Sequence, residues 1–301
     1  MFIVNVAGGP GNQFFQYAFG QSLSKKTGIP VLYNITWFKN RRLYNNPSAS
    51  TQHVYYILKL YKTTVNVATT IQCREVKELV TQTSRYPGTI SDILNIKDNL
   101  ISHYINYNKQ AGVYNPELFN LKGDFYIIGL YQSEKYFKEY RADLLKDFTL
   151  DIPLDDKNIS MLLHIKSTQA VSLHIRRGDY VKLGWQLPMS YYEDAIRYIK
   201  SKIKNPYFYI FSNDCEYVRN NLKIDSPAAI VDINPPNKGY YDLELMRNCK
   251  HNIIANSTFS WWGAWLNNNP EKIVIAPYPW VVKGDNFKDI VPESWVKIEH
   301  S

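Results

Sequence analysis

The sequence predicts an α/β protein with two domains, and three observations lead to this prediction. The chain has 301 residues, whereas a single domain commonly has roughly 150. Residues 2–6 form an apolar strand pattern that ends at a glycine loop and leads into an amphipathic helix. Residues 171–175 form a second strand pattern, which ends at the sharp turn that Gly178 allows. Strands that alternate with helices along a chain are typical of α/β proteins.

The boundary between the two domains is expected at residues 150–156. This stretch combines a proline with several acidic residues, a composition that interrupts both helices and strands. We therefore divide the chain into an N-terminal domain, residues 1–153, and a C-terminal domain, residues 154–301. Residues 35–125 contain no motif that indicates a function.

The composition restricts the kinds of partner that the protein can have. With 45% hydrophobic and 21% charged residues, the chain is globular and not disordered. A net charge of +8 favours an anionic partner, which could be nucleic acid, an acidic membrane surface or a phosphorylated substrate. Because no long block of lysine and arginine is present, we expect no nucleic-acid partner.

The cysteines and the first residues predict the compartment. The three cysteines are too few and too scattered for a disulfide framework or a zinc site. Residues 1–6 lack the basic start and the long apolar segment of a signal peptide. No apolar run reaches the roughly 18–20 residues of a membrane span. We therefore expect a cytoplasmic protein, with at most a peripheral contact with the inner membrane.

The strand at 171–175 delivers polar groups to its C-terminal end. Apolar residues alternate there with polar ones, so that His174 and Arg176 lie on one face. In open α/β sheets, ligands bind just beyond the C-terminal ends of the strands. The planar fork of an arginine suits a diphosphate, because it donates two parallel charge-assisted hydrogen bonds. His174, Arg176 and Asp179 are therefore candidates for binding a phosphorylated ligand; the alternative is an edge strand with a surface arginine pair.

The N-terminal glycine loop does not have the features of a dinucleotide-binding site. The third glycine of that motif is replaced by Phe14, and the second strand ends at Asn34 and not at an acidic residue. Asn12 and Gln13 instead open the first helix, and a capping role for Asn12 is one interpretation of its position.

Polar residues that commonly cap helices predict three further helix starts in the C-terminal half. Ser190 with Glu193 forms the pattern of a capping box. Asp214 follows the strand at 207–211 and has two interpretations: the cap of the next helix, or a carboxylate that accepts two N–H groups of guanine. Ser257 is expected to cap a helix whose free N–H groups form an anion site. Additional hydroxyl donors in that turn are Thr258 and Ser260.

Four segments together resemble one family, the α-1,2-fucosyltransferases of glycosyltransferase family 11. Residues 174–180 have the pattern His-x-Arg-Arg-Gly-Asp-Tyr, which is similar to the first motif of that family. Residues 8–18 differ only at Pro10 and Phe14 from its N-terminal signature, Gly-Gly-Leu-Gly-Asn-Gln-Met-Phe-Gln-Tyr-Ala. Segments 131–137 and 256–266 resemble two further motifs, and the second of these is highly specific.

The resemblance implies the GT-B fold, in which two Rossmann-like domains face each other across a cleft. It implies that residues 1–153 lie on the acceptor side and that residues 154–301 bind GDP-β-L-fucose. The implied reaction moves fucose, with inversion, to the 2-hydroxyl of a terminal galactose on an oligosaccharide. The alternatives are another GDP-sugar-dependent transferase, a fucosyltransferase of different linkage, and a binding module without catalysis.

The resemblance also implies roles for individual residues. The implied catalytic residues are Arg176, Asp179 and Asn12. The implied donor-binding residues are His174, Arg176, Asp214, Ser257, Thr258, Ser260, Gly11 and Gln13. In related fucosyltransferases an aspartate placed like Asp214 holds the guanine base. Asp179 is either the general base or the partner of Arg177 in a salt bridge.

No metal and no further cofactor is expected. Metal-dependent glycosyltransferases usually hold a cation on an Asp-x-Asp motif, whereas the acids at Asp151, Asp155 and Asp156 form no such cluster. A departing diphosphate still requires positive charge as the glycosidic bond breaks. Arg176 and the helix that starts after Ser257 could supply that charge in place of a metal.

Overall fold

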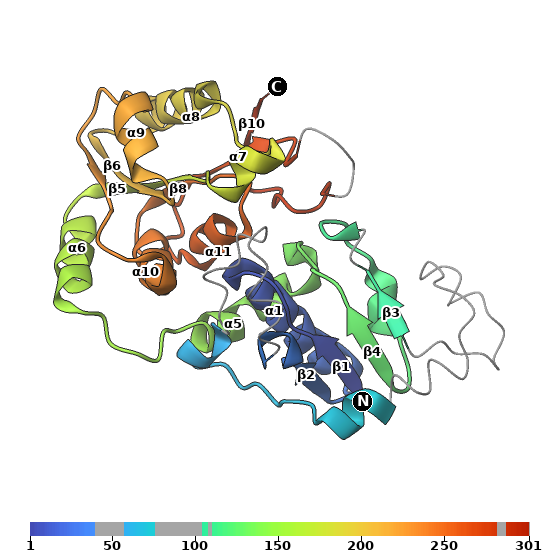
Figure 1. Cartoon of the computed structure of the whole chain (residues 1–301). Coiled ribbons are helices and arrows are strands. Elements are labelled where there is room, and N and C mark those ends of the chain that lie inside the picture. The colour runs from blue at the N-terminus through green and yellow to red at the C-terminus, as the bar shows by residue number, and fades with distance from the viewer. Residues whose placement is uncertain (40–56, 76–103, 108–109, 282–286, 301) are drawn as a thin grey trace.

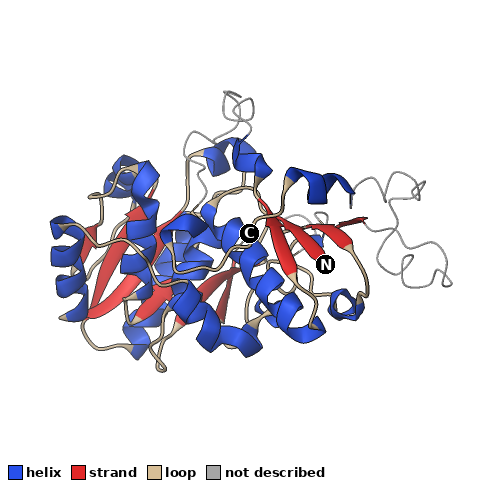
Figure 2. Ribbon diagram, turned by 90° about the horizontal axis from the view of Figure 1, so that it is seen from below, coloured by secondary structure: helices blue, strands red, loops and turns tan. Residues whose placement is uncertain are grey.

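The computed structural model describes residues 1–39, 57–75, 104–107, 110–281 and 287–300. The described chain forms two α/β units, each built around its own parallel sheet (Figure 1). Figure 2 shows the two sheets as separate layers, with helices packed around each. The predicted architecture of two Rossmann-like units is thereby confirmed. Within the described residues, no helix has both the length and the apolar character that crossing a bilayer requires.

The N-terminal sheet has the strand order β2-β1-β4-β3, and every pairing in it is parallel. Its strands are β1 (Phe2–Asn5), β2 (Val31–Asn34), β3 (Tyr104–Asn106) and β4 (Phe125–Ile128). The first helix, α1 (Pro10–Thr27), begins with a proline, whose fixed φ suits that position, and ends at Gly28 in the left-handed region. Its N-cap is Gly9, so the capping role considered for Asn12 is wrong.

The C-terminal sheet has the strand order β10-β9-β8-β5-β6-β7, again with parallel pairings. Its strands are β5 (Gln169–Ile175), β6 (Pro206–Ser212), β7 (Ala228–Ile230), β8 (His251–Ile253), β9 (Val274–Tyr278) and β10 (Val296–Glu299). This is the order of a Rossmann sheet, in which the chain starts at the centre, fills one side and then crosses to the other. The order in which strands are added to the sheet reverses between β5 and β8, and a crevice for a ligand is expected at this point.

Helices cover both faces of this sheet. The helices from residue 141 onward are α5 (Arg141–Asp147), α6 (Asp156–Lys166), α7 (Asp179–Leu183), α8 (Met189–Lys202), α9 (Cys215–Asn221), α10 (Gly239–Arg247) and α11 (Thr258–Leu266). Single 3-10 turns lie at Thr36–Lys39, Leu58–Leu60, Pro116–Asn120, Glu134–Tyr136, Lys138–Tyr140 and Pro236–Lys238. Apolar side chains of α8 and α9 share one buried cluster with the sheet, and those of α6 and α10 share another.

Two local predictions for the C-terminal half were wrong. The capping box at Ser190 does not form, because α8 starts earlier, after Pro188, and no side chain caps its first turn. The apolar pattern of residues 272–277 predicts the last strand of the chain, but β10 follows it and forms an edge of the sheet. β10 alternates half-buried and exposed residues, so only one of its faces contributes to the core.

An aromatic cluster joins the two units. Phe15 of α1 lies with its ring centroid 4.5 Å from that of Trp261, and Phe14 meets Trp262 edge-on at 5.6 Å. Trp262 also donates its indole N–H to the carbonyl oxygen of Gly11 at 3.0 Å. Because these rings are buried, α1 and α11 belong to one hydrophobic core that spans both halves of the chain.

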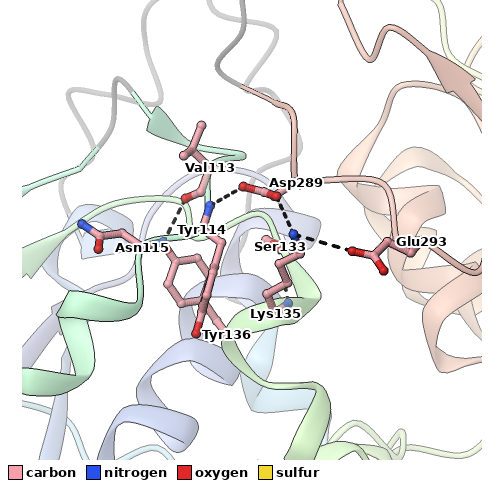
Figure 3. A network of polar contacts seen from close by, with 8 residues as sticks. All are labelled: Val113, Tyr114, Asn115, Ser133, Lys135, Tyr136, Asp289 and Glu293. Carbon is pink, nitrogen blue, oxygen red and sulfur yellow. Dashed lines mark hydrogen bonds and ion pairs between the residues drawn. The ribbon is translucent and has the colours of Figure 1, made fainter.

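The C-terminal segment also returns to the N-terminal unit (Figure 3). Asp289 accepts a hydrogen bond from the backbone N–H of Tyr114 at 2.9 Å and pairs with the Lys135 ammonium at 2.7 Å. Trp280 and Trp295 are buried in the shared core. The segment that follows β9 therefore helps to hold the two units together.

The contact of Gly11 with α11 predicts the effect of a single added methyl group. An added Cβ at Gly11 would lie 2.5 Å from the carbonyl carbon of Thr258, whereas nothing lies within 4 Å of the same position at Gly9. We expect Gly11→Ala to lower the free energy of unfolding by about 1–3 kcal/mol, because backbone cannot yield as a side chain would. Gly9→Ala is the matched control and should have little effect. Equal stabilities of the two variants in urea titrations would contradict this packing role.

Candidate functional site

The candidate site lies where the C-terminal ends of β5 and β8 are neighbours. The register pairs Leu173 of β5 with Ile253 of β8, so the loops that follow these strands emerge side by side. The β5 loop carries the arginine pair, and the β8 loop leads into α11. β6, which pairs with β5 on the other side, ends at Ser212 and brings Asp214 to the same edge. The topology therefore brings together three of the segments that the sequence singled out.

Arg176 is held by an acid but keeps hydrogen-bonding capacity. One of its terminal nitrogens, Nη2, lies 2.6 Å from Oδ1 of Asp179, and its guanidinium carbon lies 5.2 Å from the centre of the Tyr180 ring. Its Nε is buried and has no hydrogen-bond partner among the described residues. A buried donor without a partner is costly in a folded protein. A ligand oxygen in front of Arg176 would satisfy it.

Arg177 is oriented differently and supports the neighbouring loop. Its Nε lies 3.0 Å from Oδ2 of Asp214, and its guanidinium carbon lies 3.2 Å from the centre of the Tyr217 ring. Asp214 also caps α9 by accepting the backbone N–H of Tyr217 at 3.1 Å. The capping interpretation of Asp214 is thus confirmed. The salt bridge considered between Asp179 and Arg177 is wrong, since Asp179 pairs with Arg176 instead.

Gly178 is required where the two loops meet. Its φ is +61°, a value that favours glycine, and an added Cβ would lie 2.3 Å from the side-chain nitrogen of Asn213. The side-chain oxygen of Asn213 accepts the backbone N–H of Arg177 at 2.8 Å. This contact fixes the loop after β5 to the loop after β6.

His174 is a neutral buried side chain beneath Arg176. It is 5% exposed, its ring lies 5.8 Å from that of Phe259, and its Nδ1 has no hydrogen-bond partner. Burial, and then the charge of Arg176, lower the pKa of His174 to about 3. The imidazole therefore cannot supply positive charge near neutral pH. It can only donate or accept a hydrogen bond.

Asn256 belongs to the site although its role was not predicted. It is 4% exposed, and its side-chain nitrogen donates to the carbonyl oxygen of Trp185 at 2.9 Å. Its backbone oxygen accepts the Tyr180 hydroxyl at 3.2 Å, whereas its side-chain oxygen has no partner. The signal that could have identified it is its position, directly beyond the β8 strand and before the helix start.

The start of α11 is the last part of the candidate site. Ser257 is the N-cap residue, but its side chain makes no capping hydrogen bond. Ser260 donates its hydroxyl to the carbonyl oxygen of Ser257 at 3.2 Å, which turns that hydroxyl toward the helix itself. The first N–H groups of a helix have no partners within it, and the helix dipole favours an anion there. The unpartnered polar atoms of His174, at the end of β5, and of Asn256, in the loop after β8, indicate a ligand independently.

The predicted N-terminal residues lie beside this helix start, and the structure gives them packing or internal contacts. Gly11 is packed on Thr258. Asn12 accepts a hydrogen bond from Gln132 at 2.8 Å. Gln13 is fully buried; its amide donates to Gly8 and accepts from the backbone of Ile57. Ligand contacts of these residues remain predictions.

The described residues contain no group of three or more His, Cys, Asp or Glu side chains placed to hold a metal ion. The acids closest to the site, Asp179 and Asp214, are each engaged by a different arginine. Whether the reaction depends on a metal stays a prediction for experiment.

Comparison with known proteins identifies the family. Residues 1–299 match the model of Glycosyl transferase family 11, and the chain belongs to this family. An Escherichia coli protein described as alpha-1,2-colitosyltransferase is 34% identical and covers 99% of this chain and 98% of its own. The O-antigen biosynthesis glycosyltransferase WbnK, also of Escherichia coli, is 29% identical over 97% of this chain and 99% of its own. A Bos taurus galactoside alpha-(1,2)-fucosyltransferase 2 is 28% identical over 48% of this chain and 45% of its own.

Solved structures with a similar arrangement include two glycosyltransferases. The fucosyltransferase NodZ from Bradyrhizobium aligns with a TM-score of 0.46 at 11% identity, over 87% of this chain and 90% of its own. The Escherichia coli ADP-heptose lps heptosyltransferase II aligns with a TM-score of 0.45 at 12% identity, over 99% of this chain and 92% of its own.

The buried His174 predicts how stability depends on pH. Its folded pKa is lowered to about 3, so the unfolded chain binds this proton first as the pH falls through about 6.5. We expect this group to reduce the free energy of unfolding by about 2 kcal/mol between pH 7.5 and pH 5. His174→Gln should weaken that dependence in urea titrations. An unchanged pH profile for His174→Gln would contradict this account.

Proposed function

We propose that this protein is an inverting glycosyltransferase that moves a 6-deoxy sugar from a GDP-sugar to the 2-hydroxyl of a terminal galactose. The proposal depends mainly on one observation. A buried Arg176 Nε without a hydrogen-bond partner among the described residues and the start of α11 both lie at the crevice position of a Rossmann sheet. Membership of Glycosyl transferase family 11 supports the reaction class. The α-1,2 linkage is supported by the names of relatives.

In this proposal the diphosphate lies between Arg176 and the α11 N-terminus. Both groups are fixed before the reaction: Arg176 by Asp179, and α11 by the aromatic cluster. As the glycosidic bond breaks, negative charge grows on the departing oxygen, and preorganised donors stabilise that charge without further rearrangement. Asp179 then acts mainly by orienting Arg176.

The guanine base is proposed to lie near Asp214, beside β6. The observation that supports this place is the ion pair of Asp214 with Arg177, which holds the carboxylate at the edge of the sheet. About a third of the Asp214 side chain remains exposed to solvent. That part of the carboxylate is free to accept N–H groups from a base, in addition to capping α9.

We propose inversion because of the acids that the described residues place near the site. A double displacement requires a carboxylate nucleophile beside the sugar together with a second carboxyl group. Asp179 and Asp214 are instead held in ion pairs with arginines. A single displacement remains, in which the galactose hydroxyl attacks from the face opposite the diphosphate. We place the galactose toward the N-terminal unit at Asn12, because the neighbouring Gly11 is packed against the start of α11, while the fully buried Gln13 holds that loop from within.

The donor sugar is L-fucose in our proposal, and colitose is the second candidate. Colitose is the 3-deoxy form of L-fucose, and the relative described as a colitosyltransferase covers nearly the whole chain. A site that hydrogen-bonds a hydroxyl rejects the deoxy analogue strongly, whereas an apolar site discriminates only weakly in the opposite direction. A different linkage on the same acceptor remains the alternative reaction.

The donor and the linkage can be tested together. Purified protein is incubated with galactose-terminated disaccharides and either GDP-β-L-fucose or GDP-colitose, and the product is analysed by NMR. We expect an α-L-fucoside on O2 of galactose, formed from GDP-fucose with the higher kcat/KM. Faster transfer from GDP-colitose would assign the second donor. A β-linked product, or a product on O3 or O4, would contradict both mechanism and linkage.

Replacing Arg176 tests the proposed binding of the diphosphate. Arg176→Lys keeps the charge but loses the planar fork, and one charge-assisted hydrogen bond is worth about 1.5–3 kcal/mol. We expect kcat/KM to fall about 10- to 100-fold with little change in melting temperature. Arg197→Lys is the control, because Arg197 forms an equivalent i,i+3 pair with Asp194 on an exposed surface. Wild-type turnover in a folded Arg176→Lys protein would refute the role.

A further inference from the structure

The segment that follows the arginine pair exposes apolar side chains at the edge of the site. α7 ends at Leu183, and Gly184 follows in the left-handed region. Val181 is 41% exposed, Leu183 55% and Trp185 48%. An indole so exposed has a large apolar surface that no other part of the described chain covers. Its position relative to the site decides whether that surface has a use.

Trp185 is fixed to the site through its own backbone. Its N–H donates to the carbonyl oxygen of Tyr180 at 2.9 Å. Its carbonyl oxygen accepts the side-chain amide of Asn256 at 2.9 Å. Both anchors belong to the site, and the Tyr180 hydroxyl closes the arrangement by donating to the Asn256 backbone. The exposed indole therefore stands on a rigid frame and is not carried by a free loop.

The side chain of Trp185 is also connected to the proposed diphosphate position. Its ring lies 5.7 Å from the Tyr180 ring and nearly perpendicular to it. The Tyr180 ring in turn lies 5.2 Å from the guanidinium carbon of Arg176. Only two side-chain contacts separate the indole from the arginine.

We propose that Trp185 is the platform on which the acceptor galactose stacks, an inference that rests on the proposed function. One face of galactose is apolar, because its axial 4-hydroxyl leaves a patch of C–H groups on the other side of the ring. An aromatic ring with an apolar face and a fixed orientation suits such a patch at a low entropic cost. The unpartnered side-chain oxygen of Asn256 can then accept a sugar hydroxyl beside it.

A lipid surface is the other occupant to consider. An apolar patch that binds membranes usually combines its apolar side chains with several basic residues. The segment 180–186 contains only Lys182 as a basic residue. The hydrogen bond that fixes the Trp185 backbone to Asn256 has no purpose in membrane binding, where a residue on a mobile loop would serve equally. The observations therefore favour the sugar.

The test measures KM for a soluble galactoside and for the GDP-sugar in three variants. We expect Trp185→Ala to raise the acceptor KM about tenfold, while the donor KM and the affinity for GDP stay at wild-type values. Trp185→Phe, which keeps an aromatic face, should recover most of the loss. Leu183→Ala is the matched control, because it removes an equally exposed apolar side chain of the same segment, and it should change neither constant.

The outcomes separate this inference from the proposed function. An unchanged acceptor KM in Trp185→Ala, or a donor KM that rises in step, would overturn the platform while leaving the transferase activity established. Co-sedimentation with anionic phosphatidylglycerol vesicles that falls equally in Trp185→Ala and Leu183→Ala, with acceptor KM unchanged, would identify a membrane face instead. A wild-type protein that transfers no sugar from any GDP-sugar to any galactoside would overturn the proposed function and the platform together.

Discussion

The packing of α1 against α11 is the contact on which the rest of the structure depends. Trp262 donates to the Gly11 carbonyl, and Gly11 lies directly on Thr258. Each of these helices follows the first or the fourth strand of its own Rossmann-like unit, so their starts mark the ligand-binding edges of the two sheets. The buried rings between them leave no room for the helices to slide. The two edges are thereby presented to one another.

The polar groups at the C-terminal edge of the β5–β8 sheet are of two kinds. Some bond to one another and hold the loops in place, and others have no hydrogen-bond partner among the described residues. Arg177, Asn213 and Asp214 satisfy one another and fix the loops after β5 and β6. Arg176 Nε, His174 Nδ1 and Asn256 Oδ1 remain unpartnered and buried. Such atoms cost stability unless a ligand meets them. Their position together at the C-terminal ends of the neighbouring strands β5 and β8 is therefore a stronger indication of function than any one residue type.

Much of the fold could be predicted because local patterns agreed with the final packing. The strand at 171–175, the helix after Ser257 and the cap at Asp214 each depend on a few neighbouring residues. Predictions failed where a distant contact decided the outcome. Asp179 has two arginines within reach in the sequence, and the turn at Gly178 selects Arg176. The position of Asn256 between a strand and a helix start is a local signal, but its contact with Trp185, 71 residues earlier in the chain, could not be predicted from its neighbours.

The groups that bind the C-terminal carbonyl oxygens of α11 affect the electrostatic field at its N-terminus. Lys272 donates to the backbone oxygens of Ala264 and Asn267, and Arg141, from the other unit, donates to those of Trp265 and Asn267. Arg141 thus places a cation at the negative pole of a helix only about 13 Å long, whereas burial and the charge of Arg141 lower the pKa of Lys272 to about 7, so that Lys272 is only partly charged near neutral pH. With that pole partly neutralised, an anion at the first turn experiences mainly the positive pole. The helix then behaves less like a dipole than like a fixed partial charge directed at one point.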